Sequence, residues 1–293
     1  MKKQITEKNT CKKSSQLKMI VKRFGKNRLS IIGMVIILIL VAAIALAPLY
    51  CSYDKVIQQS LSQRFLSPSA EHFFGTDQYG RDLFARIVYG GRISLFCGLV
   101  TIGIAFVAGM VLGCAAGFFG GMTDTIIMRF CDVLMAIPGL LLAMAIVSAL
   151  GQGIGNMLIA LSISQIPREA RTARSCVMTL RNQEYIEAAK TCGTSRFRII
   201  WRHIVPNILG PMIIDVMMGL GSTILRIASL GFLGIGIASP TPEWGTIISE
   251  NQINIRYYPY LGIIPGLFIM ITVLSFNFIG DGLRDALDPK MKN

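Results

Sequence analysis

The residue types that carry out catalysis are scarce in this chain of 293 residues. Only two histidines, His72 and His203, are available for an acid–base or metal centre. The seven cysteines contain no C-x-x-C pair, and their odd number does not suit a closed disulfide framework. No G-x-x-x-x-G-K-[ST] phosphate loop occurs, so the usual machinery of nucleotide hydrolysis is missing. We therefore predict no catalytic residue, no metal ligand and no cofactor bound by this chain itself.

Two charged residues lie in or next to a long apolar stretch. Asp215 lies about eleven residues into the stretch 204–225, and in a bilayer a charge at that depth costs about 2.5 to 3.5 kcal/mol. It either lines an aqueous path or neutralises an intramembrane cation, for which Arg129 and Arg92 are the candidates. Arg226 follows on nearly the same helical face, about 16 Å along the axis. Arg226 either lines the same path or extends its charge to the outer headgroups.

A third group of residues has the spacing of a docking element. Its members are Glu184, Glu187, Ala188, Ala189, Gly193 and Pro206. The two glutamates lie early in a short predicted helix and Lys190 lies late, which complements the helix dipole. The paired alanines remove side-chain bulk, so another surface can come close. The glycine suits the left-handed residue that ends a helix, and the proline suits the first turn of the next one.

The composition indicates which solvent surrounds these residues. The chain is 53% hydrophobic and 15% charged, whereas charged residues make up about a quarter of soluble domains. The net charge of +13 would suit nucleic acid only if the basic residues shared a soluble face. Instead, ten of the 29 Lys and Arg lie in residues 2–28 and eight in residues 168–202. Such clustering is typical of cytoplasmic segments in a membrane protein, so we expect lipid contact and no nucleic acid.

Six apolar stretches predict an all-α integral membrane protein with about six transmembrane helices. The predicted spans are 31–50, 93–119, 125–149, 154–167, 204–225 and 261–280. The first is too long and too far from the start for a signal peptide. With both ends in the cytoplasm, the charge bias predicts the following division. The segments are a cytoplasmic tail (1–30), a first helix (31–50), an extracytoplasmic segment (51–91), a core transmembrane domain (92–283) with a cytoplasmic loop (168–206), and a tail (284–293).

Two further patterns predict packing. Gly109, Gly113 and Gly117 recur every four residues, so they share one helix face and let another helix come close, although a functional hinge is an alternative. In the turn-rich segment 76–82, Arg81 has neighbouring carboxylates with which to pair. We expect a structural clamp there rather than direct contact with a substrate.

The segment 184–206 resembles the EAA loop of ABC importer permeases. The pattern of that loop is E-A-A, three residues, Gly, and Leu-Pro about 12 and 13 residues later. The chain matches it except that Val205 stands where Leu is usual. In that family the loop docks into a cleft on the ATPase subunit and transmits its motion. An ordinary cytoplasmic loop is the alternative interpretation.

The resemblance extends along most of the chain, to the second permease of oligopeptide, dipeptide and nickel importers. The similar segments are 74–95, 132–146, 229–236, 239–245 and 276–289. The resemblance implies a type I permease fold in the cell membrane and a heterodimer with a related permease. It also implies two cytoplasmic ATPases that bind ATP and Mg²⁺, and an extracytoplasmic substrate-binding protein.

The resemblance leaves the cargo open between dipeptides, longer peptides, nickel and metal chelates. Peptide-type relatives often carry Glu where this chain has Ile227, preceded by Arg226. Two other classes of function lack their expected sequence features. A secondary transporter should show internal repeats, which the sequence lacks, and a membrane-embedded enzyme would need clustered nucleophiles or metal ligands.

Overall fold

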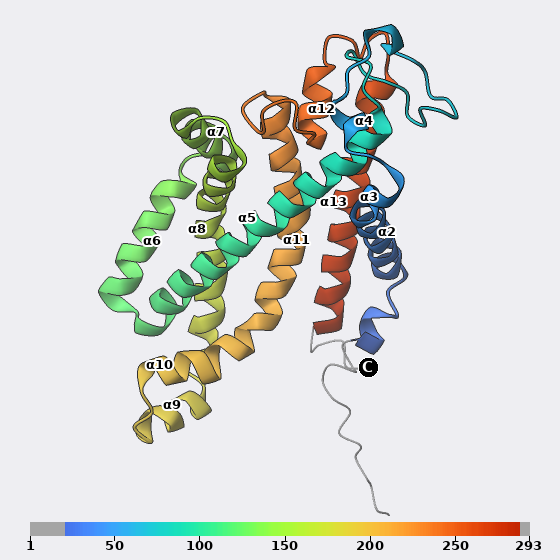
Figure 1. Cartoon of the computed structure of the whole chain (residues 1–293). Coiled ribbons are helices and arrows are strands. Elements are labelled where there is room, and N and C mark those ends of the chain that lie inside the picture. Colours follow the sequence, from blue (N-terminus) through green and yellow to red (C-terminus); the bar gives the residue numbers. More distant parts are fainter. Residues whose placement is uncertain (1–20, 288–293) are drawn as a thin grey trace, which may run out of the picture.

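The computed structural model describes residues 21–287, which form a bundle of helices without a β-strand (Figure 1). A 3₁₀ turn, η1 (Leu61–Gln63), and a π-helical turn, η2 (Ile200–Ile204), accompany the α-helices. The α-helices are α2 (Arg28–Ala45), α3 (Ala47–Tyr50), α4 (Asp54–Ile57), α5 (Leu83–Phe119), α6 (Gly121–Met135), α7 (Gly139–Leu150), α8 (Ile154–Leu180), α9 (Glu184–Thr191), α10 (Arg196–Ile199), α11 (Val205–Phe232), α12 (Trp244–Glu250) and α13 (Tyr260–Leu287).

Four helical runs among the described residues are long and apolar enough to cross a membrane. They are α2, α5, the run from α10 to α11, and α13, and the bent pair α6–α7 makes five if it counts as one span. The helix α8 is also long enough, but it carries four charged residues, beginning with Arg168. The six predicted spans therefore correspond to six helical segments, of which α8 is the most polar.

The first and last described helices meet at one end of the bundle. The side chain of Asn27 caps α2 by accepting from the backbone N–H of Leu29 and of Ser30. Its amide nitrogen donates to Asp285, near the end of α13, over 3.1 Å. The start of α2 and the end of α13 thus lie at the end of the bundle where α9 and α10 lie (Figure 1). The predicted topology requires this arrangement of the first and last spans, while the predicted terminal tails fall largely outside the described residues.

The glycines at every fourth position of α5 are packing positions. A Cβ added at Gly109 or Gly113 would meet the backbone of α8 near Ala170, and one at Gly117 would meet Val177. The two helices come this close only because the glycines have no side chain. The predicted packing role is confirmed.

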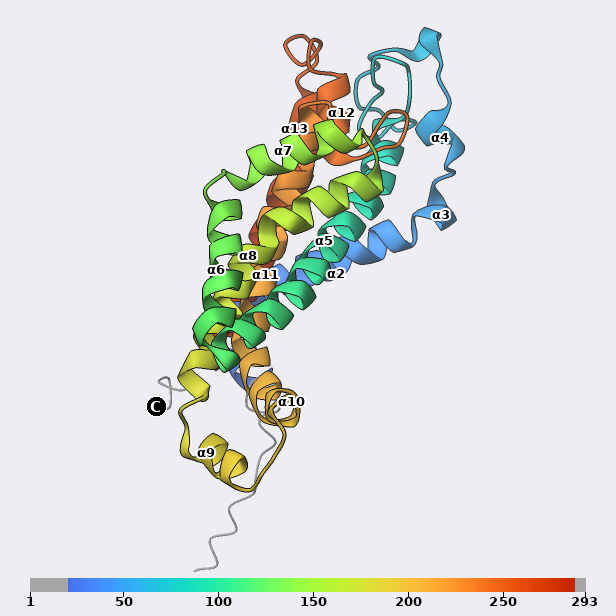
Figure 2. The same ribbon diagram turned by 90° about the vertical axis from the view of Figure 1, so that its left-hand side faces the viewer.

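The predicted span 125–149 is not one straight helix. It is broken between α6 and α7, whose axes differ by 85°, and Figure 2 shows α7 lying across the bundle end to which α6 leads. Pro138 stands directly before α7 with ψ of 127°. Its nitrogen carries no hydrogen to donate, and its ring clashes with the carbonyl of a preceding helical turn, so the helix ends there and a new one begins.

Three other predicted spans are shorter than the helices of the structure. The helix α5 begins at Leu83, ten residues before the predicted start, because the side chain of Asp82 caps it by accepting from the N–H of Ala85. The helix α8 continues through Pro167 to Leu180. The helix α11 continues to Phe232. Residues 168–180, predicted as part of a cytoplasmic loop, thus extend the bundle.

A buried ion-pair network fastens the predicted extracytoplasmic segment to α12. Arg81 donates to Asp77 over 2.6 Å and to Glu250 over 2.7 Å, and Arg86 donates to Glu250 over 2.7 Å. The side chains of both arginines are at most 1% exposed. The structural clamp expected of Arg81 is therefore present. Glu250 and Arg86 complete it, and neither was predicted. Glu250 is 169 residues from Arg81, and Arg86 lies in the first turn of α5, where no helix was predicted.

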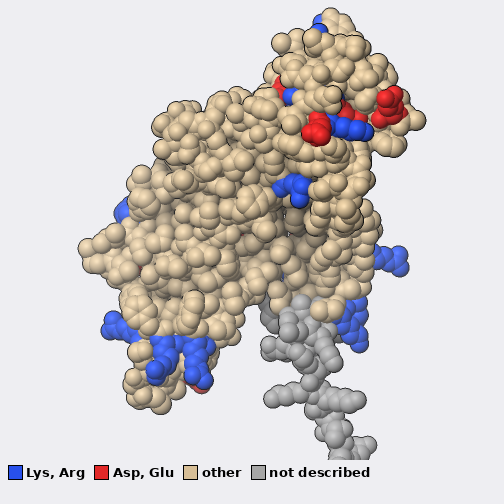
Figure 3. Space-filling model, in the orientation of Figure 1, with Lys and Arg blue, Asp and Glu red and all other residues tan. Residues whose placement is uncertain are grey.

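Charge is distributed unevenly over the bundle. In Figure 3, Lys and Arg gather at the end formed by α9 and α10, whereas the opposite end shows Asp and Glu beside Lys and Arg. Basic side chains therefore predominate at the α9–α10 end, and the opposite end carries both signs of charge.

Candidate functional site

The helix α9 is a short, exposed element at one end of the bundle (Figure 2). Glu184 and Glu187 lie in its first turn and are exposed, as is Ala188. Ile186 is the one fully buried side chain of this helix. Ala189 is half-buried and packs against the same cluster as Ile186. Apart from these two, α9 presents most of its side chains outward, as a docking element must.

The helix ends at Gly193, as the sequence predicted. This residue has φ of 75°, the N–H of Thr194 donates to the carbonyl of Ala189, and the N–H of Gly193 donates to that of Lys190. These two bonds form a Schellman motif, in which the residue with positive φ is normally glycine. A Cβ at Gly193 would meet nothing within 4 Å. Glycine is required there by the backbone conformation and not by lack of space.

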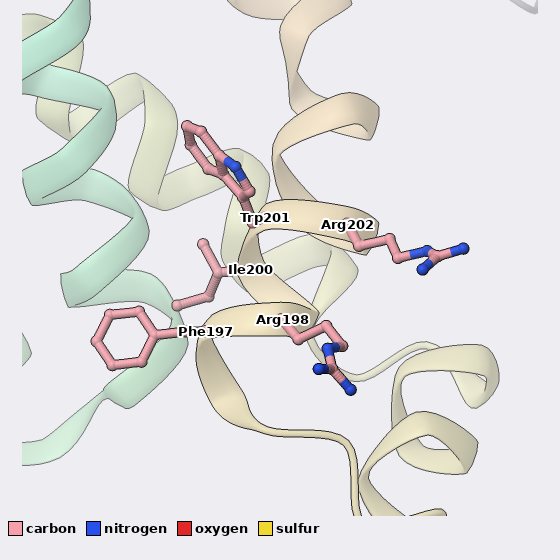
Figure 4. Close-up of a pocket in the computed structure, with 5 residues that line it drawn as sticks. All are labelled: Phe197, Arg198, Ile200, Trp201 and Arg202. Carbon is pink, nitrogen blue, oxygen red and sulfur yellow. The ribbon is translucent and has the colours of Figure 1, made fainter.

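A helical arm then leads from the loop into the bundle through α10, η2 and α11. Pro206 lies in the first turn of α11, as predicted, and it cannot donate a hydrogen bond to the preceding turn. Phe197, Ile200 and Trp201 project from one side of the arm, and two arginines project from the other (Figure 4). These residues line an open groove of about 650 Å³. The arm is thus amphipathic at its surface.

Apolar contacts tie the loop to the long helices. Ile186 of α9 and Ile199 of α10 are buried in one cluster with Met110 of α5 and Val177 of α8. Arg181, which follows α8, donates to the carbonyl of Gly117 over 3.0 Å. A displacement of α9 would therefore be passed to α5 and α8, because a close-packed cluster moves as a unit.

Asp215 pairs with a residue that was not predicted. Its carboxylate accepts from Arg168 of α8 over 2.6 Å and from the hydroxyl of Thr172 over 3.3 Å. The proposed partners Arg92 and Arg129 are wrong, since Arg92 lies over the ring of Tyr89 instead. The error has a clear cause. A loop was predicted to begin at residue 168. In the structure α8 continues past this position, so the guanidinium of Arg168 lies next to α11.

Arg226 lies deeper in α11 than predicted, because the helix continues six residues beyond it. Its side chain is half-buried, and a Cβ at Gly139, the first residue of α7, would lie 3.6 Å from its guanidinium. No acidic side chain pairs with it among residues 21–287. The structure thus brings Asp215 and Arg226 to the same side of α11, facing α8 and α7, without bringing them into contact.

The polar side of α8 was not predicted from the sequence. Its three arginines recur at every third position and pair with aspartates of α6 and α11. Higher on the same helix, buried Gln165 accepts from Thr223 of α11 over 2.9 Å. The three-residue spacing was visible in the sequence, but it carries meaning only once these residues are known to be helical.

Two family models match the chain. Residues 109–293 match the binding-protein-dependent transport system inner membrane component. Residues 15–68 match the N-terminal TM domain of oligopeptide transport permease C. The first covers α6 to α13, including the loop with α9, and the second covers the first helix and part of the segment that follows it.

Several curated proteins are similar over nearly the whole chain. The dipeptide transport system permease protein DppC of Alkalihalophilus pseudofirmus is 46% identical over 93% of this chain and 89% of its own length. DppC of Haemophilus influenzae is 40% identical over 92% and 93%. The glutathione transport system permease protein GsiD of Pectobacterium atrosepticum is 39% identical over 93% and 90%.

Among solved structures, a chain of the MetNI methionine ABC transporter in an inward-facing conformation shares the fold. Its TM-score is 0.57 at 18% identity, over 69% of this chain and 97% of that chain. The four or five apolar spans and the matching family place this multi-pass protein in the plasma membrane. By the family model and by relatives that cover nine tenths of it, the chain belongs to the binding-protein-dependent transport system inner membrane components.

Proposed function

We propose that this chain is a permease subunit of an ATP-driven importer of small peptides. The observation that carries the proposal is the exposed helix α9, which ends at Gly193 and is joined through Ile186 to the core of the bundle. A helix that is exposed for docking and rigidly packed at its base suits the transfer of motion from an ATPase. The relatives named for dipeptide and glutathione transport favour a peptide cargo over nickel.

The proposed assembly contains partners that supply what this chain lacks. Two cytoplasmic ATPase subunits would bind ATP and Mg²⁺ and would dock against residues 184–206, while this chain performs no catalysis. A related permease would complete the translocation path as a heterodimer. A substrate-binding protein would deliver cargo to the outer end, where the Arg81 network holds the surface rigid.

Asp215 and Arg226 are proposed to face the translocation path. Both are charged residues within a membrane-spanning helix, where such residues usually face an aqueous route or a helix bundle. The carboxylate of Asp215 would attract a cationic group of the cargo, such as a peptide amino terminus. Arg226 has no acidic partner among the described residues, so it would attract a carboxylate.

The experiment that tests the coupling role replaces Gly193. Gly193→Val forces a β-branched side chain into a left-handed conformation, which costs at least about 1–2 kcal/mol. Since a side chain at this position meets nothing, Gly193→Asn is the matched control, because Asn tolerates positive φ. We expect the valine variant to reach the membrane in normal amount and to lose ATP-driven uptake, and the asparagine variant to retain most of it. Normal uptake and normal ATPase coupling in Gly193→Val would refute the coupling role.

A further inference from the structure

Three arginines on α8 form a ladder of ion pairs with other helices. Arg168 pairs with Asp215 of α11 over 2.6 Å. Arg171 pairs with Asp132 of α6 over 2.8 Å. Arg174 is held by both carboxylate oxygens of Asp124, near the start of α6. The opposite side of α8 is buried against α5, where Ala170, Ala173 and Val177 lie together with the carboxyl side chain of Glu169.

The three pairs differ in how open they are. Arg171 and Asp132 are 51% and 50% exposed, and Arg168 and Asp215 are 48% and 21% exposed. Arg174 and Asp124 are 29% and 22% exposed, and their contact is bidentate. The Arg171 pair is therefore accessible to a ligand from both partners and the Arg168 pair from its guanidinium, whereas the Arg174 pair is a closed structural contact.

The open pairs lie at a depth where hydrocarbon cannot surround them. Asp132 is eleven residues along α6 from Gly121, and this spacing corresponds to about 16 Å of helix. The hydrocarbon core is about 30 Å thick, so a turn at the cytoplasmic surface puts Asp132 near its middle. Half-exposed charged groups at that depth usually face water or another protein chain. The open face of α8 must therefore line an aqueous path or meet the second permease.

Resting on the proposed peptide import, we propose that the face formed by Arg168, Arg171, Asp132 and Asp215 is a cargo site for a zwitterion. A peptide with free termini carries one ammonium and one carboxylate. The ammonium would bind an aspartate and the carboxylate would bind an arginine. The site thus selects cargo by the presence of both termini.

The geometry explains why a zwitterion fits better than a simple ion. Arg168 and Arg171 are three residues apart on one helix, so their Cβ atoms are about 5–6 Å apart and the two ion pairs are neighbours. A ligand with a single charge that displaced one partner would leave the other charge without its counter-charge, so it would lose one charge-assisted hydrogen bond for the one it gains. A zwitterion can replace both partners of an opened pair, and no charge is left without a counter-charge.

The test exchanges the two charges of the Arg171 pair. The variant Asp132→Arg with Arg171→Asp keeps an ion pair between α6 and α8 but reverses its polarity. The matched control, Asp124→Arg with Arg174→Asp, reverses the closed pair on the same two helices. Each variant would be assembled with its partner permease, ATPases and binding protein in proteoliposomes. ATP-driven uptake of radiolabelled dialanine and the amount of assembled complex would be measured.

We expect the exchanged Asp132–Arg171 pair to assemble and to lower dialanine uptake about tenfold or more, because a charge-assisted hydrogen bond to cargo contributes about 1.5–3 kcal/mol. The exchanged control pair should retain uptake. Arg171→Gln is a second variant that creates no like-charge contact if the exchange fails to assemble, and it should show the same loss.

Two outcomes would count against the proposal, and they can be told apart. Wild-type uptake by the exchanged Asp132–Arg171 variant, or by Arg171→Gln, would overturn the cargo site and leave the pair as a helix clamp. A wild-type complex without ATP-driven dialanine uptake would overturn the proposed peptide import and the cargo site with it.

Discussion

Arg168 of α8 and Asp215 of α11 are joined by a hydrogen-bonded ion pair of 2.6 Å. The helix α8 ends four residues before α9 begins, and the arm that follows α9 continues into α11. The pair therefore links the helix that precedes α9 to the helix that follows it. Any motion of α9 that separates α8 from α11 must break this contact or be resisted by it.

Asp215→Asn should lower transport without lowering assembly. The side chains of Arg168 and Asp215 are 48% and 21% exposed, and partly exposed pairs contribute no more than about 1 kcal/mol to folding. We expect uptake to fall about tenfold, the equivalent of 1.4 kcal/mol in binding. ATP-driven uptake and the amount of complex in the membrane are the measurements. If assembly fell instead, and a second change, Arg168→Gln, restored it, Asp215 would serve only to neutralise Arg168.

Gly113→Ala should reduce the amount of folded protein, whereas Gly103→Ala should not. A Cβ at Gly113 would meet Ala170 and Ala173 of α8, while one at Gly103 in the same helix would meet nothing within 4 Å. Overpacking of this kind costs about 1–3 kcal/mol. Thermal unfolding of the detergent-solubilised variants would measure the difference. Equal stability of the two variants would mean that α5 and α8 can separate at no cost.

Arg81→Gln should destabilise the outer end of the molecule. It would leave buried Asp77 with only the longer 3.7 Å contact to Arg86, and it would remove one of the two guanidinium partners of Glu250. Removing one partner from a buried ion-pair network in this way costs about 3–5 kcal/mol. Arg64→Gln is the control, since Arg64 is exposed in the same segment, and it should change stability by no more than about 0.5 kcal/mol. Chemical denaturation of the purified protein would compare them. Similar values for both would show that the network adds no stability.

Glu243, in the segment between α11 and α13, should make stability depend on pH. Burial raises the pKa of this carboxyl, although hydrogen bonds from Thr246 and Ser94 oppose the shift. Because the folded state then holds the proton more tightly than the unfolded state, stability is greatest below the ordinary glutamate pKa of about 4.3. The stability falls as the pH rises through the raised pKa of Glu243.

Glu243→Gln removes this titration and keeps an oxygen that can accept from the N–H of Thr246. Stability measured across mildly acidic to neutral pH should therefore vary less in the variant than in the wild type. An unchanged pH profile would show that Glu243 does not titrate in this range.

The amino-acid sequence alone determined the membrane class and the ends of helix α9. These features follow from local physical chemistry. About 20 apolar residues in a row need a bilayer, and a glycine after a short helix needs no distant partner to adopt positive φ. For the same reason the positions of Gly193 and Pro206 were predicted correctly. The glycine spacing of α5 also predicted a close helix contact, although it did not predict that α8 is the helix in contact.

Only the tertiary structure decided which charges meet. Arg168 and Asp215 are 47 residues apart, and Arg81 and Glu250 are 169 residues apart. An ion pair over such a separation depends on where two helices cross and which faces they turn to each other. Hydropathy ends a predicted span at the first charged residue, so α8 was cut short at residue 168 and its arginines were assigned to a loop. In the fold these arginines form ion pairs with aspartates of α6 and α11. The pairing allows the charged part of α8 to remain helical within the bundle.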